Sequence, residues 1–79
     1  MVETQIAPRY RVMKAAKIVA GAAVIDCTVR DLSITGAALD VHSQVGIPAN
    51  FTLVMPGDGL HLPCHVVWRK AFRIGVAFN

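Results

Sequence analysis

The sequence predicts an all-β protein, a small six-stranded antiparallel β-barrel with no substantial C-terminal helix. Three observations support this fold class. The chain has 79 residues, which is enough for one small domain. Its apolar residues recur with a period of two, the pattern of a strand with one buried face. Turn residues separate these short segments, and closure into a barrel removes the exposed edges of so small a sheet.

The expected elements follow one another along the chain without a helical interval. Residues 1–8 are polar and aperiodic, which predicts a flexible N-terminal lead-in before a barrel domain over residues 9–79. A first strand is expected at about residues 14–20, and five further strands follow it. Their inward faces are the apolar members of each alternation: Ile25, Cys27, Val29; Ala37, Leu39, Val41; Phe51, Leu53, Met55; Leu60, Leu62, Cys64, Val66, Trp68; Phe72, Ile74, Val76, Phe78.

Turn-forming residues lie where each of these strands has to end, which supports the strand boundaries. Glycine, proline and aspartate are favoured in turns because they adopt or stabilise turn backbone conformations. The expected turns are at Gly21, Gly36, Gly46 to Pro48, Pro56 to Gly59, and Lys70 with Ala71.

Composition excludes several classes of protein. Hydrophobic residues make up 54% of the chain and charged residues 16%, so a disordered polar segment is excluded. The uncharged intervals, residues 18–25 and 41–57, are too short or too rich in turn residues to cross a membrane. The run at 18–25 also does not fit a signal peptide, because Asp26 follows it directly and its removal would destroy the domain.

The net charge of +3 belongs to the first segment of the chain. Residues 1–17 contain four basic residues and one acidic residue, whereas the remainder contains four of each. The expected barrel is therefore neutral, and the basic segment is either a solvated terminus or a site for an anion.

No catalytic or metal-binding constellation is present, so we expect a binding module rather than an enzyme. His61 and His65 would share one metal ion on a helix, but on a strand they are about 13 Å apart. Cys27 and Cys64 have no metal-type spacing and are expected to be reduced core thiols of a cytoplasmic protein. No nucleophile–base pair or glycine-rich phosphate loop is found.

Two segments carry the chemistry for binding. Arg9 and Arg11 lie in the basic segment, and arginine forks match phosphate oxygens and the edge of guanine. Asp31, Ser33 and Gly36 lie between two expected strands, where a carboxylate and a hydroxyl can accept or donate to a nucleotide. The alternative for this second segment is an ordinary turn built from aspartate and serine.

Together the two segments resemble the PilZ domain, a bacterial receptor module for cyclic di-GMP. The family pattern is Arg-x-x-x-Arg before the first strand and Asp/Asn-x-Ser-x-x-Gly between the second and third strands. Asp31-Leu-Ser33-Ile-Thr-Gly36 matches the second motif in full. The endings Val66-Val-Trp-Arg69 and Ile74-Gly-Val-Ala-Phe78 are similar to the last two strands of PilZ barrels.

The first motif departs from the family. No two arginines have the required spacing, and if Arg9 takes the second position, Gln5 occupies the first. Glutamine can hydrogen-bond a guanine edge but cannot neutralise phosphate. Arg11 could take the place of the missing arginine from a neighbouring position, although one step along an extended chain reverses the direction of a side chain.

The resemblance implies a cyclic di-GMP receptor in bacterial signalling, with no other cofactor. Arg9 and Arg11 would hold phosphate and guanine, with Gln5 beside them. Asp31 and Ser33 would hydrogen-bond the other guanine edge. Gly36 would allow the backbone to approach the ligand closely. The basic segment would close over the ligand.

The sequence suggests one alternative function and disfavours another. A PilZ fold acting only as a protein-interaction module, or as a homodimer, is suggested by the absent first arginine and by the outward Ala38, Val54, Val67 and Ala77. A barrel binding DNA or RNA is disfavoured, because the aromatic residues Phe51, Trp68, Phe72 and Phe78 are expected to face inward and the barrel is neutral.

Overall fold

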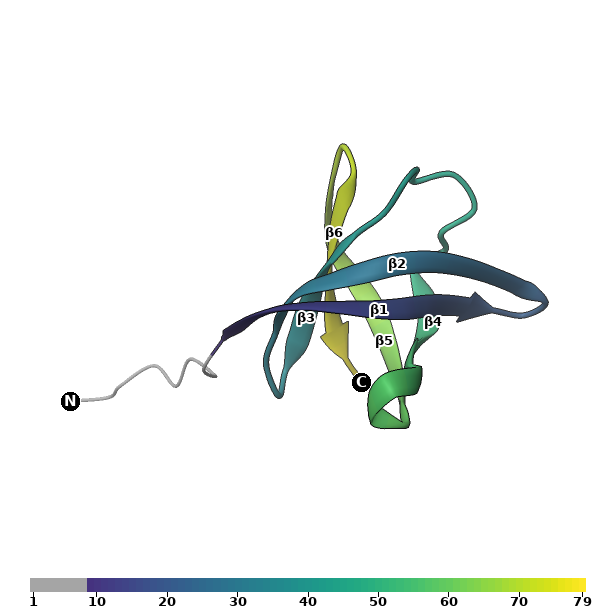
Figure 1. Ribbon diagram of the computed structural model, residues 1–79. Helices are drawn as coiled ribbons and strands as arrows, with labels where there is room; N and C mark the ends of the chain where they lie inside the picture. The colour runs from purple at the N-terminus through teal and green to yellow at the C-terminus, as the bar shows by residue number, and fades with distance from the viewer. Residues whose placement is uncertain (1–8) are drawn as a thin grey trace.

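The computed structural model describes residues 9–79 and confirms the expected fold, a closed barrel of six antiparallel strands (Figure 1). Around the barrel the strands follow the order β1-β2-β3-β6-β5-β4, and pairing of β4 with β1 closes it. The lead-in predicted for residues 1–8 lies outside the described residues. The strands are β1 (Tyr10–Ala20), β2 (Ala23–Leu32), β3 (Gly36–Asp40), β4 (Asn50–Met55), β5 (Leu60–Lys70) and β6 (Arg73–Phe78).

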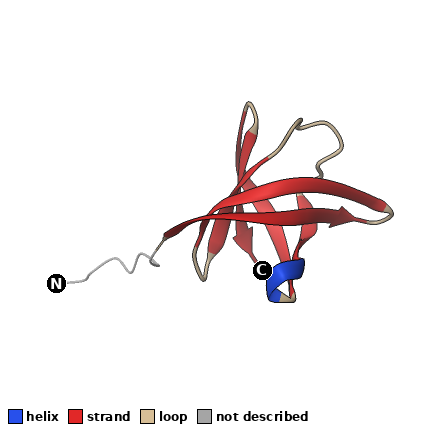
Figure 2. Ribbon diagram, viewed as in Figure 1, coloured by secondary structure: helices blue, strands red, loops and turns tan. Residues whose placement is uncertain are grey.

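A single short helical turn interrupts the strands. It is η1 (Pro56–Asp58), a 3₁₀ turn that the proline and the left-handed Gly59 after it favour. The Nζ atom of Lys14 in β1 forms an ion pair with Oδ2 of Asp58 at 2.9 Å, which holds this turn against the barrel. In Figure 2, η1 is the blue element among the red strands. No helix within residues 9–79 has the length and apolar character needed to cross a membrane.

The barrel interior is filled by the apolar residues that alternation predicted for most strands. Ile18, Val29, Leu39, Leu53 and Ile74 are fully buried, and the described residues contribute no buried polar side chain to this core. Because such a core excludes water, its burial is the main source of stability for so short a chain. Both cysteines belong to it and are free thiols.

Three irregularities in strand pairing change which way the following side chains face. In β1, Val12 and Met13 lie opposite the single residue Arg30 of β2, between the pairs made by Arg11 and Lys14, so β1 has one extra residue here. In β2 the extra residue is Arg30, and in β5 it is Val67. An extra residue in one strand reverses the inside–outside alternation beyond it.

Two aromatic residues that were expected inside the barrel lie at its surface, one of them because of the bulge in β5. Beyond Val67 the alternation reverses, so Trp68 faces outward with 40% of its surface exposed. Arg69 is exposed, and its guanidinium donates a hydrogen bond to the Ile47 carbonyl at 2.9 Å. Phe72, expected inside, lies in the turn after Ala71 and is 67% exposed. The expectation that the protein does not bind nucleic acid therefore depends on the neutral charge of the barrel and no longer on these aromatic residues.

Candidate functional site

The turn between β2 and β3 is built by the side chain of Ser33. Its Oγ accepts hydrogen bonds from the backbone N–H groups of Thr35 and Gly36, each at 3.2 Å. The Ser33 N–H donates to the Gly36 carbonyl at 2.9 Å and closes the turn. The turn interpretation of this motif is therefore confirmed for Ser33, whose hydroxyl remains half-exposed at the surface.

Gly36 is required by close packing rather than by an unusual backbone angle. It begins β3, opposite Ala77 of β6, and a Cβ atom at this position would overlap the Val76 carbonyl oxygen. The sequence interpretation assigned the glycine to a tight turn and to ligand approach. The structure shows that the chain approaching Gly36 is β6.

The bulge at Arg30 directs Asp31 to the outer surface of the barrel. Because Arg30 is an extra residue, Asp31 pairs with Ala38, and the side chains of directly paired residues share one face of the sheet. Arg11 pairs with Asp31 from the other side, across β1 and β2. Arg11 and Asp31 are therefore neighbours on one face, although they are twenty positions apart in the numbering.

These elements border a groove of about 590 Å³ on the outside of the barrel, which we call the motif groove. Its size falls in the range of small-molecule sites. Four of the predicted site residues line it, and they come from the chain before β1, the end of β2, the β2–β3 turn and the start of β3. The residues that line the motif groove are Arg9, Asp31, Leu32, Ser33, Thr35, Gly36, Ala37, Ala38, Val67, Trp68, Arg73, Gly75, Val76 and Ala77.

Trp68 is a residue of the motif groove that the sequence interpretation placed elsewhere. It pairs with Gly75 across β5 and β6, and a Cβ atom on Gly75 would overlap the indole ring. The ring therefore lies directly over the Gly75 backbone, with one part of its surface open to the groove. The sequence feature that could have indicated this contact is Gly75, which lies two residues before the Ala77 that pairs with Gly36.

Arg73 is the second residue that sequence reasoning missed. Its Nε donates to Asp40 Oδ1 at 2.6 Å, and Arg30 holds the other oxygen of that carboxylate at 2.9 Å. The hydrogen bond that Arg73 donates to Asp40 raises the pKa of Arg73, and the charge of Asp31 adds to this effect. The guanidinium is thus fixed on the outer face as a cation at the rim of the motif groove.

The predicted site residues have three outcomes. Arg9, Asp31, Ser33 and Gly36 line one groove. Arg11 is not among the lining residues, although it neighbours Asp31. Gln5 lies outside the described residues.

Comparison with protein families decides which family has this arrangement. The model described as the PilZ domain matches residues 5–79, nearly the whole chain. The chain belongs to the PilZ family. PilZ domains form a family of ligand-binding and adaptor modules of the cyclic di-GMP type. No curated protein matched this PilZ chain.

Proposed function

We propose that this PilZ protein is a cyclic di-GMP receptor whose basic N-terminal segment closes over the nucleotide against the motif groove. The observation that carries the proposal is the placement of Arg9 in one groove with Asp31 and Ser33. Arg9 precedes β1, and Asp31 and Ser33 lie at the end of β2 and in the turn after it. The pairing of Tyr10 with Leu32 holds both segments at the open end of the β1–β2 hairpin.

Each part of the groove has a chemical role in this proposal. Arg9 and Arg73 supply two cationic forks for the phosphates, and Arg11 adds positive charge one strand away. Asp31 accepts hydrogen bonds from the N–H edge of a guanine. Trp68 offers a flat apolar surface on which a base can stack.

Gln5 and Gly36 have lesser roles in the proposal. Gln5 would hydrogen-bond the second guanine in place of the family's first arginine. Gly36 maintains the groove floor by allowing β3 to lie against β6. We therefore expect binding that is weaker than a pair of arginines would give, because a charge-assisted hydrogen bond contributes about 1.5–3 kcal/mol.

The single tryptophan of the chain allows a direct test. Cyclic di-GMP should quench Trp68 fluorescence in a saturable way, and calorimetry on the same samples gives affinity and stoichiometry. Arg9→Ala should weaken binding by about tenfold or more, the equivalent of one charge-assisted contact. Lys17→Ala is the matched control, since Lys17 is also basic and on the same segment but is paired with Asp26 away from the groove. A ligand concentration of about 100 µM is enough to detect a binding free energy of roughly −5 kcal/mol, so absence of binding at this concentration would contradict the proposal.

A second candidate function is a protein-interaction module without nucleotide binding. It is favoured by the apolar wall of the motif groove, in which Val67 is 55% exposed and lies with Ala38 and Ala77. Val54, the fourth residue of the predicted surface, is half-buried in β4, away from this wall. Light scattering separates the cases. A homodimer or partner complex that forms without cyclic di-GMP and is lost in Val67→Asp would favour this function.

A further inference from the structure

Part of β2 has an open edge on the side away from β1. Pairing with β1 continues to Ala23, but pairing with β3 begins only at Thr28. Within residues 9–79 no strand pairs with residues 23–27 on that side, which we call the β2 edge. An unpaired strand edge is a template for another extended chain.

The pairing register shows which backbone groups of the β2 edge point outward. Ala20 and Ala23 close a two-residue turn, so they form a hydrogen-bonded pair. Hydrogen-bonded and non-hydrogen-bonded pairs alternate along an antiparallel ladder. The N–H and C=O groups of Val24 and Asp26 therefore point away from β1, toward the space where β3 would continue.

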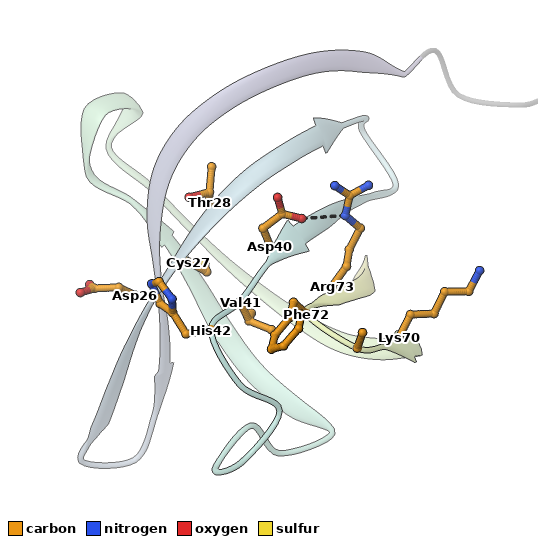
Figure 3. A pocket seen from close by; sticks show the side chains of 10 residues that line it. Asp26, Cys27, Thr28, Asp40, Val41, His42, Lys70, Phe72 and Arg73 are labelled. Carbon is orange, nitrogen blue, oxygen red and sulfur yellow. Dashed lines mark hydrogen bonds and ion pairs between the residues drawn. The ribbon is translucent and has the colours of Figure 1, made fainter.

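The chain vacates that space directly after β3. The Val41 N–H donates to the Phe72 carbonyl at 2.8 Å, which draws the chain from β2 toward the β5–β6 turn. A cavity of about 670 Å³, which we call the edge pocket, lies at this divergence (Figure 3). The residues that line the edge pocket are Asp26, Cys27, Thr28, Asp40, Val41, His42, Lys70, Ala71, Phe72 and Arg73.

The edge pocket combines an apolar surface with positive charge. Phe72 is two-thirds exposed and lies beside Val41 in Figure 3, and Ala71 before it has a positive φ of 29°. Asp40 is shared between Arg30 and Arg73, and Lys70 adds a further cation to the lining. Asp26 is neutralised by Lys17 at 2.6 Å. This balance favours an apolar group that has an acidic group close to it.

We propose that the β2 edge and the edge pocket form a docking site for an extended peptide of a partner protein. The peptide pairs antiparallel with β2 through Val24 and Asp26, in the place where β3 would continue. A large apolar side chain of the peptide packs on Phe72, and an acidic side chain lies near Lys70 and Arg73. Backbone hydrogen bonds then supply affinity and the pocket supplies selectivity, the usual division in strand addition. This site needs no nucleotide, so it stands independently of the proposed receptor function.

Selection from a phage-displayed library of random octapeptides on the full chain tests the proposal. We expect enriched peptides to carry a large apolar residue two positions from an acidic one, since alternate residues share one face of a strand. With the strongest peptide bound, amide hydrogen exchange at Val24 and Asp26 should slow by at least about tenfold. Failure to enrich any such peptide, or protection at the motif groove in place of the β2 edge, overturns the proposal.

Matched variants separate backbone pairing from side-chain effects. Asp26→Pro removes an outward N–H that has no strand partner, a position where a strand tolerates proline, and should weaken the peptide by at least about tenfold. Asp26→Asn keeps the N–H and loses the Lys17 pair, so it should stay within about threefold. If Asp26→Pro does not fold, methylation of single backbone nitrogens of the peptide tests the same hydrogen bonds on the unaltered protein.

The pocket and the competing occupants have tests of their own. Phe72→Ala should weaken the peptide by about tenfold, whereas Val67→Ala, an exposed apolar residue of the motif groove, should leave it unchanged. Equal effects of the two variants contradict the proposal. A concentration-dependent dimer without peptide, with protection at Val24 and Asp26, would show instead that a second copy occupies the edge.

Discussion

Gly36 illustrates how a motif residue can have a structural cause that its spacing does not reveal. The Asp-x-Ser-x-x-Gly pattern suggests a glycine that frees the backbone for a ligand. In the barrel, the absent side chain instead allows β3 to lie against the Val76 carbonyl of β6. Since β6 also carries Arg73 and Gly75, this contact determines how close the two walls of the motif groove lie.

Replacing Gly36 should therefore destabilise the whole barrel. Gly36→Ala places a Cβ against a backbone carbonyl that cannot move alone, and overpacking of this kind costs about 1–3 kcal/mol. Gly57→Ala is the matched control, because no atom lies within 4 Å of a Cβ at that position. Urea unfolding measures both variants. Equal free energies of unfolding for the two would contradict the packing argument.

The side chain of Asp40 makes a pH-dependent contribution to the stability of the fold. Hydrogen bonds from Arg73 and Arg30 hold the pKa of its carboxyl below the ordinary value of 3.8. A lowered folded-state pKa stabilises the fold above the unfolded value, and this stability is lost as the pH falls through the folded value.

Asp40→Asn should consequently destabilise the protein by about 1 kcal/mol at neutral pH, the scale of partly exposed ion pairs. The difference from wild type should shrink as the pH falls below 3.8, because the wild-type carboxyl is then protonated too. Chemical unfolding at several pH values measures this difference. Asp26→Asn is the comparison, since Asp26 has a single lysine partner and should show a smaller effect. A difference that does not change with pH would contradict the assignment.

At the scale of strands, alternation predicted the six elements because it reports directly on burial. Residues such as Leu53, Leu39 and Ile74 face the core as their periodicity requires. The expected first strand, residues 14–20, is too short. β1 begins at Tyr10, but the apolar alternation does not continue past the bulge between Arg11 and Lys14.

Bulges are the feature that periodicity could not predict. A bulge is one extra residue with no compositional signal, so the sequence around Val67 does not indicate that Trp68 faces outward. Arg30 has the same effect in β2, where it keeps Asp31 on the outer face. The motif predicted that Arg9 and Asp31 belong together, but Trp68 and Arg73 entered the site only through the three-dimensional register of β5 and β6.

The β1–β2 hairpin extends beyond the other strands, so its turn tests backbone strain almost free of packing (Figure 1). Gly21 has a φ of 60° and nothing lies within 4 Å of its missing Cβ. Gly21→Ala should cost about 1 kcal/mol through left-handed strain, whereas Gly21→Asn should cost less because asparagine tolerates this conformation.

Thermal unfolding measures this pair of variants. A loss of about 1 kcal/mol lowers the Tm of a domain of this size by about 4–8 °C, so the two variants should be distinguishable. Equal Tm values would show that the tip of the hairpin does not contribute to global stability.

At the scale of the whole molecule, the many apolar residues of the chain lie partly in the core and partly at the surface. Most of it fills the barrel, and the large exposed remainder includes Trp68 and Val67 at the motif groove and Phe72 at the edge pocket. Arg73 lines both cavities, and Arg9, from the segment with the net positive charge, lines the first. Three of the nine exposed large apolar side chains of residues 9–79, and one arginine of the basic segment, therefore lie at the two proposed binding sites.

The two buried thiols link the stability of the whole molecule to alkaline pH. Burial raises the pKa of Cys27 to about 12 and that of Cys64 to about 11, from an ordinary value of 9.0. Above pH 9 the unfolded chain ionises its thiols while the folded chain does not, so the free energy of the unfolded state falls relative to that of the folded state. The free energy of unfolding should fall by on the order of 1 kcal/mol per thiol at pH 10.

Urea unfolding between pH 8 and pH 10 tests this linkage, with Cys27→Val as the control for lysine and tyrosine titration. The variant lacks one thiol, so its stability should fall less steeply with pH than that of the wild type. Thiol alkylation gives an independent readout, because both sulfurs are buried and should react only after global unfolding. Rapid alkylation of the folded protein, or equal pH slopes for the two proteins, would contradict a core that holds both thiols protonated.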